Sequence, residues 1–258
     1  MSVIRLRAPS ALRGPIDVPG DKSISHRAVL FSAIAQGTTR IENVNRGDDV
    51  LASIEAVRAL GVAAESQDAV VEVRGSDELR DPAEVLDCGN SGTTMRVLCG
   101  MLAGRVDAVL DGDDSLRRRP MERVAVPLRA MGADVRCAEH GTAPIALARM
   151  TAPLKGITYE LPAPSSQVKT AIMLAALRAR GSTTVVSPQR SRDHSELMLD
   201  AMGASVKIDG LRVSVKPSAL RALGSYRVPG DVSAAAYFIA AATCVQGSRI
   251  SVLATGIN

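Results

Sequence analysis

Basic and hydroxyl side chains stand close together in residues 20–27, at a spacing that suits an anion. Lys22 offers a point charge, Ser23 offers a hydroxyl, and Arg27 follows Ser23 by four residues, on the same face of a helix. A helix that begins just after Pro19 would add free backbone N–H groups and the positive end of its dipole. Alone, these residues are equally consistent with a capped helix that exposes its basic side chains.

Other predicted helix starts are also rich in hydrogen-bond donors. Residues 89–96 combine glycines, hydroxyls and an arginine, and residues 165–167 combine two hydroxyls with an amide. Arg119 stands directly before Pro120 at the start of a predicted helix, and Arg192 has a similar position before another helix. Several such helix starts in one chain indicate a site for a small molecule with more than one negative group.

The sequence lacks the patterns of several other catalytic sites. There is no G-x-x-x-x-G-K-[ST] phosphate loop, no G-x-G-x-x-G after a strand, no G-x-S-x-G elbow and no metal-binding triad. His26 and His194 lie beside candidate anion-binding residues and are expected to support them through hydrogen bonds, whereas His140 is expected to be a bystander. The aspartates near helix starts are expected to act mostly as helix caps: Asp21, Asp48, Asp49, Asp193 and Asp231.

The overall composition is that of a globular protein with a core of small and aliphatic side chains. The chain has 258 residues, of which 46% are hydrophobic and 22% are charged. It has two Phe, three Tyr and no Trp, which argues against binding of single-stranded nucleic acid through aromatic stacking. The net charge of +4 is also too small for a nucleic-acid footprint. We therefore expect small-molecule substrates and no nucleic-acid partner.

Cysteine spacing and hydropathy predict a cytoplasmic protein. The four cysteines lie far apart with no C-x-x-C pair, and are expected to be buried thiols of a reducing cytosol rather than disulfides or metal ligands. The N-terminal residues lack the apolar run of a signal peptide. No run of about 18 uncharged apolar residues occurs, so we expect no membrane-spanning segment.

An internal repeat organises the chain. Copies of one pattern begin near residues 18, 86, 161 and 228, at nearly constant spacing. In each copy a short strand leads into a turn rich in Gly, Pro and Ser, which starts an Ala-rich helix. A glycine is expected to end that helix, and a β-branched strand follows. The glycines in this position are Gly37, Gly104, Gly181 and Gly247.

Each copy continues with a second helix and short alternating strands. The second helices are predicted at residues 49–60, 120–131 and 193–202, and alternating strands at 70–73 and 211–215. The sequence therefore predicts an α/β protein with three full units and the opening of a fourth. The fourth unit stops before its second helix, which would leave sheet surface uncovered, so we expect a truncated chain.

Taken in order, these motifs resemble those of the 5-enolpyruvylshikimate-3-phosphate synthase family, along essentially the whole chain. The segments that carry the resemblance are residues 20–27, 89–96, 119–121, 165–169 and 191–194. The resemblance implies an α/β fold of repeated βαβαββ units, the enolpyruvyl transferase fold, in two similar domains with the active site between them. Residues 15–227 would form one complete three-repeat domain, and residues 1–14 and 228–258 would belong to a second domain whose remainder is absent.

The resemblance also implies a reaction in the shikimate pathway of aromatic amino-acid biosynthesis. The enolpyruvyl group of phosphoenolpyruvate is transferred to the 5-hydroxyl of shikimate 3-phosphate, and a tetrahedral intermediate loses phosphate. No metal or organic cofactor is implied, and the full-length protein would be a monomer. Lys22 would take part in catalysis. The implied ligands of shikimate 3-phosphate are Lys22, Ser23, Arg27, Ser165, Ser166, Gln167 and Arg192, and those of phosphoenolpyruvate are Lys22, Gly92, Arg119 and Gln167.

The resemblance places the proton-transferring acidic groups, and further Arg and Lys ligands, in a C-terminal part that this sequence lacks. No general acid or base is therefore assigned, and the chain alone is expected to be inactive. Residue 92 is a glycine, which in this family would leave room for glyphosate beside phosphoenolpyruvate. We therefore expect a full-length parent that is sensitive to glyphosate.

Two other readings of the sequence stay open. UDP-N-acetylglucosamine enolpyruvyl transferase shares the fold, but it typically has a Cys near the position of Arg119, where this chain has Asp113, Asp114 and Ser115. A non-catalytic anion-binding remnant of the fold is the second alternative.

Overall fold

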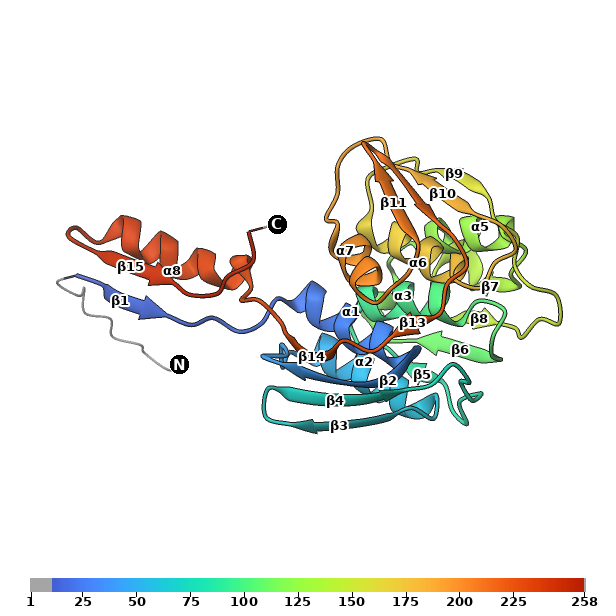
Figure 1. Cartoon of the computed structure of the whole chain (residues 1–258), viewed down its shortest axis with the longest axis horizontal. Helices are drawn as coiled ribbons and strands as arrows, with labels where there is room; N and C mark the ends of the chain where they lie inside the picture. The colour runs from blue at the N-terminus through green and yellow to red at the C-terminus, as the bar shows by residue number, and fades with distance from the viewer. Residues whose placement is uncertain (1–10, 258) are drawn as a thin grey trace.

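The computed structural model describes residues 11–257, in two bodies (Figure 1). The larger body contains most of the helices and sheets. The narrow body, at the left of Figure 1, consists of β1 (Arg13–Ile16), α8 (Val232–Cys244) and β15 (Arg249–Val252). Residues 1–10 and 258, which the sequence analysis assigns to the partial domain, lie outside the described residues.

The larger body confirms the predicted α/β fold of βαβαββ units. The second unit contains β5 (Leu86–Asp87), α3 (Gly92–Leu102), β6 (Ala108–Asp111), α4 (Asp114–Arg117), α5 (Glu122–Ala130), β7 (Val135–Cys137), a 3₁₀ turn (Glu139–Gly141) and β8 (Ile145–Leu147). The third unit contains β9 (Thr158–Glu160), α6 (Ser166–Ala176), β10 (Thr183–Val186), α7 (His194–Ala201), β11 (Val206–Asp209) and β12 (Arg212–Val215). Their sheets have the same topology, β5-β6-β8-β7 and β9-β10-β12-β11, with one parallel pair and two antiparallel pairs.

The first unit receives its first strand from a distant part of the chain. Its own elements are α1 (Lys22–Ala33), β2 (Ala35–Glu42), α2 (Asp48–Ala59), β3 (Ala63–Gln67) and β4 (Val70–Gly75). The strands β13 (Leu220–Arg221) and β14 (Gly224–Arg227) pair in parallel with β2, in the place that β5 and β9 have in the other units. The strand before α1, β1, instead pairs in parallel with β15. The first and fourth copies of the repeat have thus exchanged their opening strands.

The two connections between the bodies cross at a pair of glycines. Gly20 and Gly230 form an isolated antiparallel bridge, and the backbone N–H of Asp21 donates to the carbonyl of Pro229 at 2.8 Å. A Cβ on Gly20 would lie 1.8 Å from the carbonyl oxygen of Asn43, so only glycine fits at this crossing.

The core of the larger body is built around α1, α3 and α6. All residues of α1 from Ile24 onwards are buried, and α3 and α6 are buried over most of their length. Gly100 on α3 lets the two central helices approach closely, since a Cβ there would lie 2.1 Å from the carbonyl oxygen of Ala171 on α6. This contact fixes the first turns of both helices relative to each other.

The predicted helix-ending role of the repeated glycines is correct at Gly104 and wrong at Gly37. Gly104 has a φ of 71° and follows the end of α3 by two residues, as a C-terminal glycine does. The helix α1 ends at Ala33, and Gly37 lies inside β2 with a φ of 103°.

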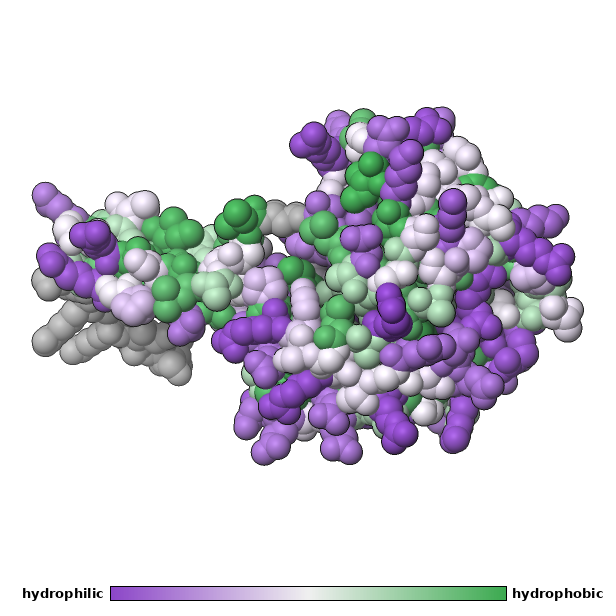
Figure 2. Space-filling view, viewed as in Figure 1, coloured by the Kyte–Doolittle hydropathy of each residue, from purple (hydrophilic) through white to green (hydrophobic). Residues whose placement is uncertain are grey.

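The narrow body has little core of its own. Ala235 is the one buried residue of α8 in the described chain, and Tyr237 is 80% exposed. Figure 2 shows hydrophobic residues gathered along the surface of this body. No helix in the part of the chain that the structure describes is long and apolar enough to cross a membrane.

Candidate functional site

The first turn of α1 presents Lys22 between two capping aspartates. Asp21 caps the helix, because its Oδ1 accepts the backbone N–H of Ile24 at 2.8 Å, and Oδ2 of Asp231 accepts the backbone N–H of Lys22 at 3.2 Å. The Lys22 ammonium lies 2.9 Å from Oδ2 of Asp49, and its side chain is half exposed. Asp49 is therefore not the helix cap that its position predicts; it is a counter-ion of Lys22.

Arg27 lies beneath this turn rather than on the surface. Its Nη1 donates to the carbonyl oxygen of Ser23 at 2.8 Å, its Nε donates to Oγ of Ser195 at 2.7 Å, and its Nη2 donates to Oγ1 of Thr170 at 3.2 Å. The residue is 2% exposed, and burial lowers the pKa of its guanidinium to about 10. Arg192 donates from Nη1 to the Ser23 hydroxyl at 3.3 Å, so the structure brings Ser23, Arg27 and Arg192 together.

A second cationic group lies at the first turn of α3. The Ser91 hydroxyl caps this helix by accepting the backbone N–H of Thr94 at 3.1 Å. Next to the cap, Gly92 leaves space that two guanidinium groups approach: a Cβ there would lie 2.8 Å from Nη1 of Arg96 and 3.3 Å from Nη1 of Arg119. The missing side chain thus lets two arginines converge on a helix N-terminus, a favourable place for an anion.

Gln167 connects this group to α6. Arg96 donates from Nη1 to Oε1 of Gln167 at 2.7 Å, and Gln167 donates from Nε2 to Oγ1 of Thr93 at 2.8 Å. Arg119 donates to the side-chain oxygen of Asn90. Residues from three segments of the chain therefore meet at one place: Asn90, Thr93, Arg96, Arg119 and Gln167.

The α3 group carries unbalanced positive charge. Burial, with smaller effects from the nearby cations Arg123 and Arg119, lowers the pKa of Arg96 to about 10. Among the described residues, neither Arg96 nor Arg119 forms an ion pair with a carboxylate. Arg96 lies in the motif at residues 89–96, yet it is not among the ligands that the family resemblance implies. Its spacing of four residues from Gly92 is the signal that places it over the same helical turn.

The first turn of α6 contributes hydroxyl groups beside Gln167. Ser165 caps this helix, since its Oγ accepts the backbone N–H of Val168 at 3.3 Å, and it remains partly exposed. The carbonyl oxygen of Ser166 accepts the Thr170 hydroxyl at 2.7 Å. Both serines can still donate their hydroxyl protons to a ligand.

A chain of buried hydroxyls joins the two cationic groups. His26 Nδ1 pairs with Oγ of Ser53 at 2.8 Å, Ser53 pairs with Oγ1 of Thr94 at 2.8 Å, and Thr94 donates to Ser91 at 2.7 Å. Burial lowers the pKa of His26 to about 3, so its ring is neutral. The carbonyl of Asp49 also accepts from Thr94 at 3.1 Å, which ties the Lys22 counter-ion to the first turn of α3.

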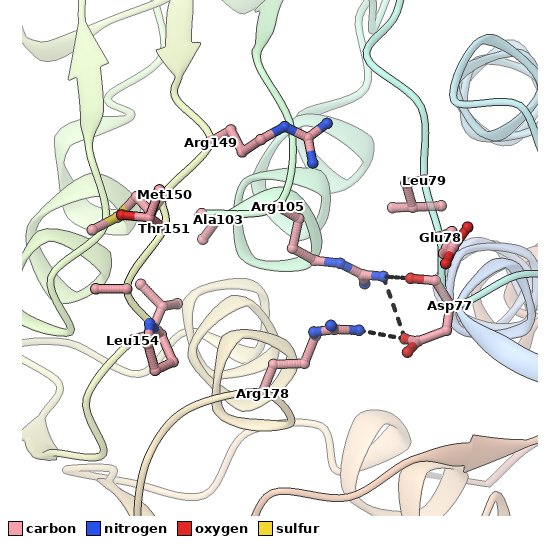
Figure 3. A pocket seen from close by; sticks show the side chains of 13 residues that line it. Asp77, Glu78, Leu79, Ala103, Arg105, Arg149, Met150, Thr151, Leu154 and Arg178 are labelled. Carbon is pink, nitrogen blue, oxygen red and sulfur yellow. Dashed lines mark hydrogen bonds and ion pairs between the residues drawn. The ribbon is translucent and has the colours of Figure 1, made fainter.

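A different pocket lies at the opposite ends of α3 and α6 (Figure 3). Its volume is about 570 Å³, and it is lined by the residues that follow these two helices, including Arg105 and Arg178. Arg178 forms an ion pair with Asp77 at 2.5 Å, and Arg105 donates to the carbonyl oxygen of Asp77 at 2.6 Å. The two arginines follow helix C-termini, which favour cations, and both bind Asp77. These contacts join the three units.

Known proteins and one protein family match this chain over nearly its whole length. The family model described as EPSP synthase (3-phosphoshikimate 1-carboxyvinyltransferase) matches residues 6–258. A relative named 3-phosphoshikimate 1-carboxyvinyltransferase from Anaeromyxobacter sp. (strain Fw109-5) is 47% identical over 98% of this chain and 58% of its own length. A relative of the same name from Synechococcus sp. (strain RCC307) is 48% identical over 100% of this chain and 61% of its own length.

A solved structure shows the same fold. The structure of EPSP synthase from Acinetobacter baumannii superposes with a TM-score of 0.90 and 44% identity, and the match covers 96% of this chain and 57% of that chain. This chain therefore spans about three fifths of the length of these relatives. None of these matches favours the alternative assignment to UDP-N-acetylglucosamine enolpyruvyl transferase. The chain belongs to the EPSP synthase (3-phosphoshikimate 1-carboxyvinyltransferase) family.

Proposed function

We propose that this chain supplies the shikimate 3-phosphate-binding part of an enzyme that transfers the enolpyruvyl group of phosphoenolpyruvate to the 5-hydroxyl of shikimate 3-phosphate. The observation that carries the proposal is the pair of cationic groups at the first turns of α1 and α3, joined through Asp49 in a member of this family. Two such groups suit the two classes of anion, carboxylate and phosphate, that these substrates present.

The proposed ligands divide between the two groups. Shikimate 3-phosphate would be held by Lys22, Ser23, Arg27, Ser165, Ser166, Gln167 and Arg192. Phosphoenolpyruvate would contact Lys22, Gly92, Arg119 and Gln167, and we add Arg96 because it orients the Gln167 amide. Fixed cations that hold both substrates would bring the reacting atoms together and stabilise charge that develops in the transition state. Lys22, whose side chain is half exposed, would be the group that acts in catalysis.

The same proposal extends to the organisation of the protein. Residues 15–227 would be one complete three-repeat domain, and residues 1–14 and 228–258 part of a second domain. The full-length protein would be a cytoplasmic monomer in which a cleft between the domains closes on the substrates. By the resemblance to the family, the acid and base would lie outside the present chain.

Calorimetric titration with shikimate 3-phosphate tests the proposal. We expect the folded chain to bind shikimate 3-phosphate more tightly than shikimate, because the phosphate adds charge-assisted hydrogen bonds. Arg192→Ala should weaken binding by about tenfold, in line with loss of one hydrogen bond to a charged group. Arg149 pairs with Asp81 beside the pocket at the opposite ends of α3 and α6. The variant Arg149→Ala is therefore the matched control and should leave the affinity for shikimate 3-phosphate unchanged. A folded chain that does not bind shikimate 3-phosphate would contradict the assignment.

Phosphate release from the two substrates tests the division of labour. We expect no turnover from the chain alone, and turnover after addition of a separately expressed C-terminal part of a relative. Release at the rate of an intact relative by the chain alone would show that the acid and base are present in it. A chain that binds the substrate but gains nothing from the added part would be a non-catalytic binding module.

A further inference from the structure

A buried ion pair lies beneath the candidate site, and no role there has been assigned to it. Lys169 on α6 and Glu196 on α7 form the pair, and their side chains are 5% and 2% exposed. Replacement of a buried ion pair by apolar side chains is often neutral or stabilising, because both charges lose their hydration on folding. The stability of the fold therefore does not account for this pair.

The residues adjacent to the pair hold Arg27. Ser195 precedes Glu196 and accepts a hydrogen bond from Nε of Arg27 at 2.7 Å. Thr170 follows Lys169 and accepts one from Nη2 of Arg27 at 3.2 Å. The two hydroxyls also bond to each other. A shift of α7 against α6 at the ion pair would thus change the hydroxyls that orient the guanidinium.

Glu196 is also the main counter-charge of Arg27. Burial lowers the pKa of Arg27, and Glu196 is the largest influence that raises it, ahead of Asp21. Asp21 already caps α1 through the backbone N–H of Ile24. Within the described chain, Oε2 of Glu196 has no hydrogen-bond partner. One carboxylate therefore serves two buried cations, Lys169 and Arg27, and one positive charge is left over.

The remaining charge lies close to helix ends that carry proposed ligands. Gln167 stands two residues before Lys169 on α6, and Arg192 stands four residues before Glu196, just ahead of α7. Burial is the main cause that lowers the pKa of His194, so its ring adds no charge at neutral pH. The excess thus comes from Arg27, whose Nη1 donates to the carbonyl oxygen of Ser23 at 2.8 Å, directly beneath the proposed ligands Ser23 and Arg192.

We propose that Glu196 is a positioning residue of the anion-binding site, which acts through its charge on Arg27. Its carboxylate holds α7 against α6 and keeps the Arg27 guanidinium in contact with Ser195 and Thr170. It also limits the net buried charge to one positive charge. A single anionic group of the substrate then balances that charge. This inference rests on the proposed function in one respect, the assignment of Arg27 as a ligand of shikimate 3-phosphate. The first test of the inference does not involve that substrate.

The first test is hydrogen exchange of the Arg27 Nε–H, followed by ¹⁵N NMR and assigned by its loss in Arg27→Lys. The bond to Ser195 should protect this proton in the parent, and Glu196→Gln should accelerate its exchange by about tenfold or more. Glu55→Gln removes an exposed carboxylate that pairs with Arg58, and as the matched control it should change nothing. Equal exchange in Glu196→Gln and the parent would overturn the proposal.

The second test compares dissociation constants for shikimate 3-phosphate. Glu196→Gln should weaken binding by about tenfold, because the unpaired charge of Lys169 would then repel the Arg27 guanidinium from its cradle of Ser195 and Thr170. Lys169→Met should also weaken it, because Glu196 then neutralises Arg27. The double variant leaves Arg27 as the only buried charge and should return the affinity to within about threefold of the parent. A double variant as weak as the single variants would overturn the role of charge.

These measurements separate the two proposals. If Glu196→Gln does not fold, the affinities of Lys169→Met and of the double variant can still be compared. We expect the double variant to bind shikimate 3-phosphate more tightly than Lys169→Met. Equally weak binding by both would count against the proposal. A parent that does not bind shikimate 3-phosphate would count against the proposed function, while exchange at Arg27 would still decide the role of Glu196.

Discussion

At Gly92, a single methyl group would reach the two arginines that make the first turn of α3 cationic. Its Cβ would lie 2.8 Å from Nη1 of Arg96 and 3.3 Å from Nη1 of Arg119. We expect Gly92→Ala to displace these groups and to weaken phosphoenolpyruvate binding by about tenfold in an NMR titration with shikimate 3-phosphate present. The guanidinium tips are flexible and Ala favours helix, so the thermal midpoint should move by less than about 2 °C. Unchanged phosphoenolpyruvate affinity would contradict the place of Gly92 in the site.

His26 should make the stability of the chain depend on pH. Burial lowers its pKa from 6.5 to about 3 in the folded chain. Below its ordinary pKa the unfolded chain takes up a proton that the folded chain does not, so the free energy of unfolding falls as the pH falls. Between pH 7 and pH 5 we expect His26 to account for a loss of about 2 kcal/mol.

Urea unfolding at both pH values measures this loss. The variant His26→Asn should lose less stability than the parent between the two values, because it removes the titrating ring. His140→Asn replaces an exposed ring and serves as the matched control with the parent's pH dependence. If the parent and His26→Asn lose the same free energy of unfolding between pH 7 and pH 5, His26 does not take up a proton on unfolding.

The sequence predicts part of the site and misses the part that depends on distant contacts. Spacing places Ser23 and Arg27 on one helical face, and a hydrogen bond between them is present. The burial of Arg27 does not follow from spacing, because Thr170 and Ser195 lie far along the chain. The same reason explains why Arg96 was missed: its partner Gln167 is on another helix.

Among the elements, α3 and α6 are the pair whose separation most directly sets the site. Gly100 lies at their contact, and a Cβ there would lie 2.1 Å from the carbonyl oxygen of Ala171. Backbone cannot move aside as a side chain can, so we expect Gly100→Ala to lower the free energy of unfolding by about 3 kcal/mol, measured by urea denaturation. Gly92→Ala makes the same change in the same helix and should leave stability near that of the parent. Equal stability of the two variants would contradict the close helix contact.

The order of elements was predictable from the sequence, but the pairing of the outer strands was not. The repeat predicted the turn, helix and strand pattern of each unit, because these signals are local. The opening strands before α1 and α8 precede identical Val-Pro-Gly-Asp motifs at residues 18–21 and 228–231. Local patterns therefore assign each strand to the helix that follows it. The structure pairs them the other way, β1 with β15 and β14 with β2, since the chain crosses at Gly20 and Gly230.

Across the whole molecule, contacts at both ends of the central helices hold the larger body together. The three units meet at the first turns of α1, α3 and α6, and again where Asp77 joins Arg105 and Arg178 (Figure 3). The narrow body is joined to this frame by the crossing at Gly20 and Gly230. Backbone hydrogen bonds link the two connections at the crossing, and Ala235 is the one residue of α8 that is buried in the described chain, so we expect the two bodies to open independently.

Amide hydrogen exchange should therefore differ sharply between α8 and α1. In α8 only Ala235 is buried among the described residues, whereas α1 is buried from Ile24 to Ala33. Local opening costs little where few apolar contacts are lost, so amides of α8 should exchange at least about 100-fold faster than those of α1 by mass spectrometry of peptides. The helix α2, which has one solvent-facing side, is a suitable control for solvent access, because it packs on the core through Val50 and Ile54 and should exchange slowly. Similar exchange in α8 and α1 would show instead that the narrow body unfolds only together with the larger one.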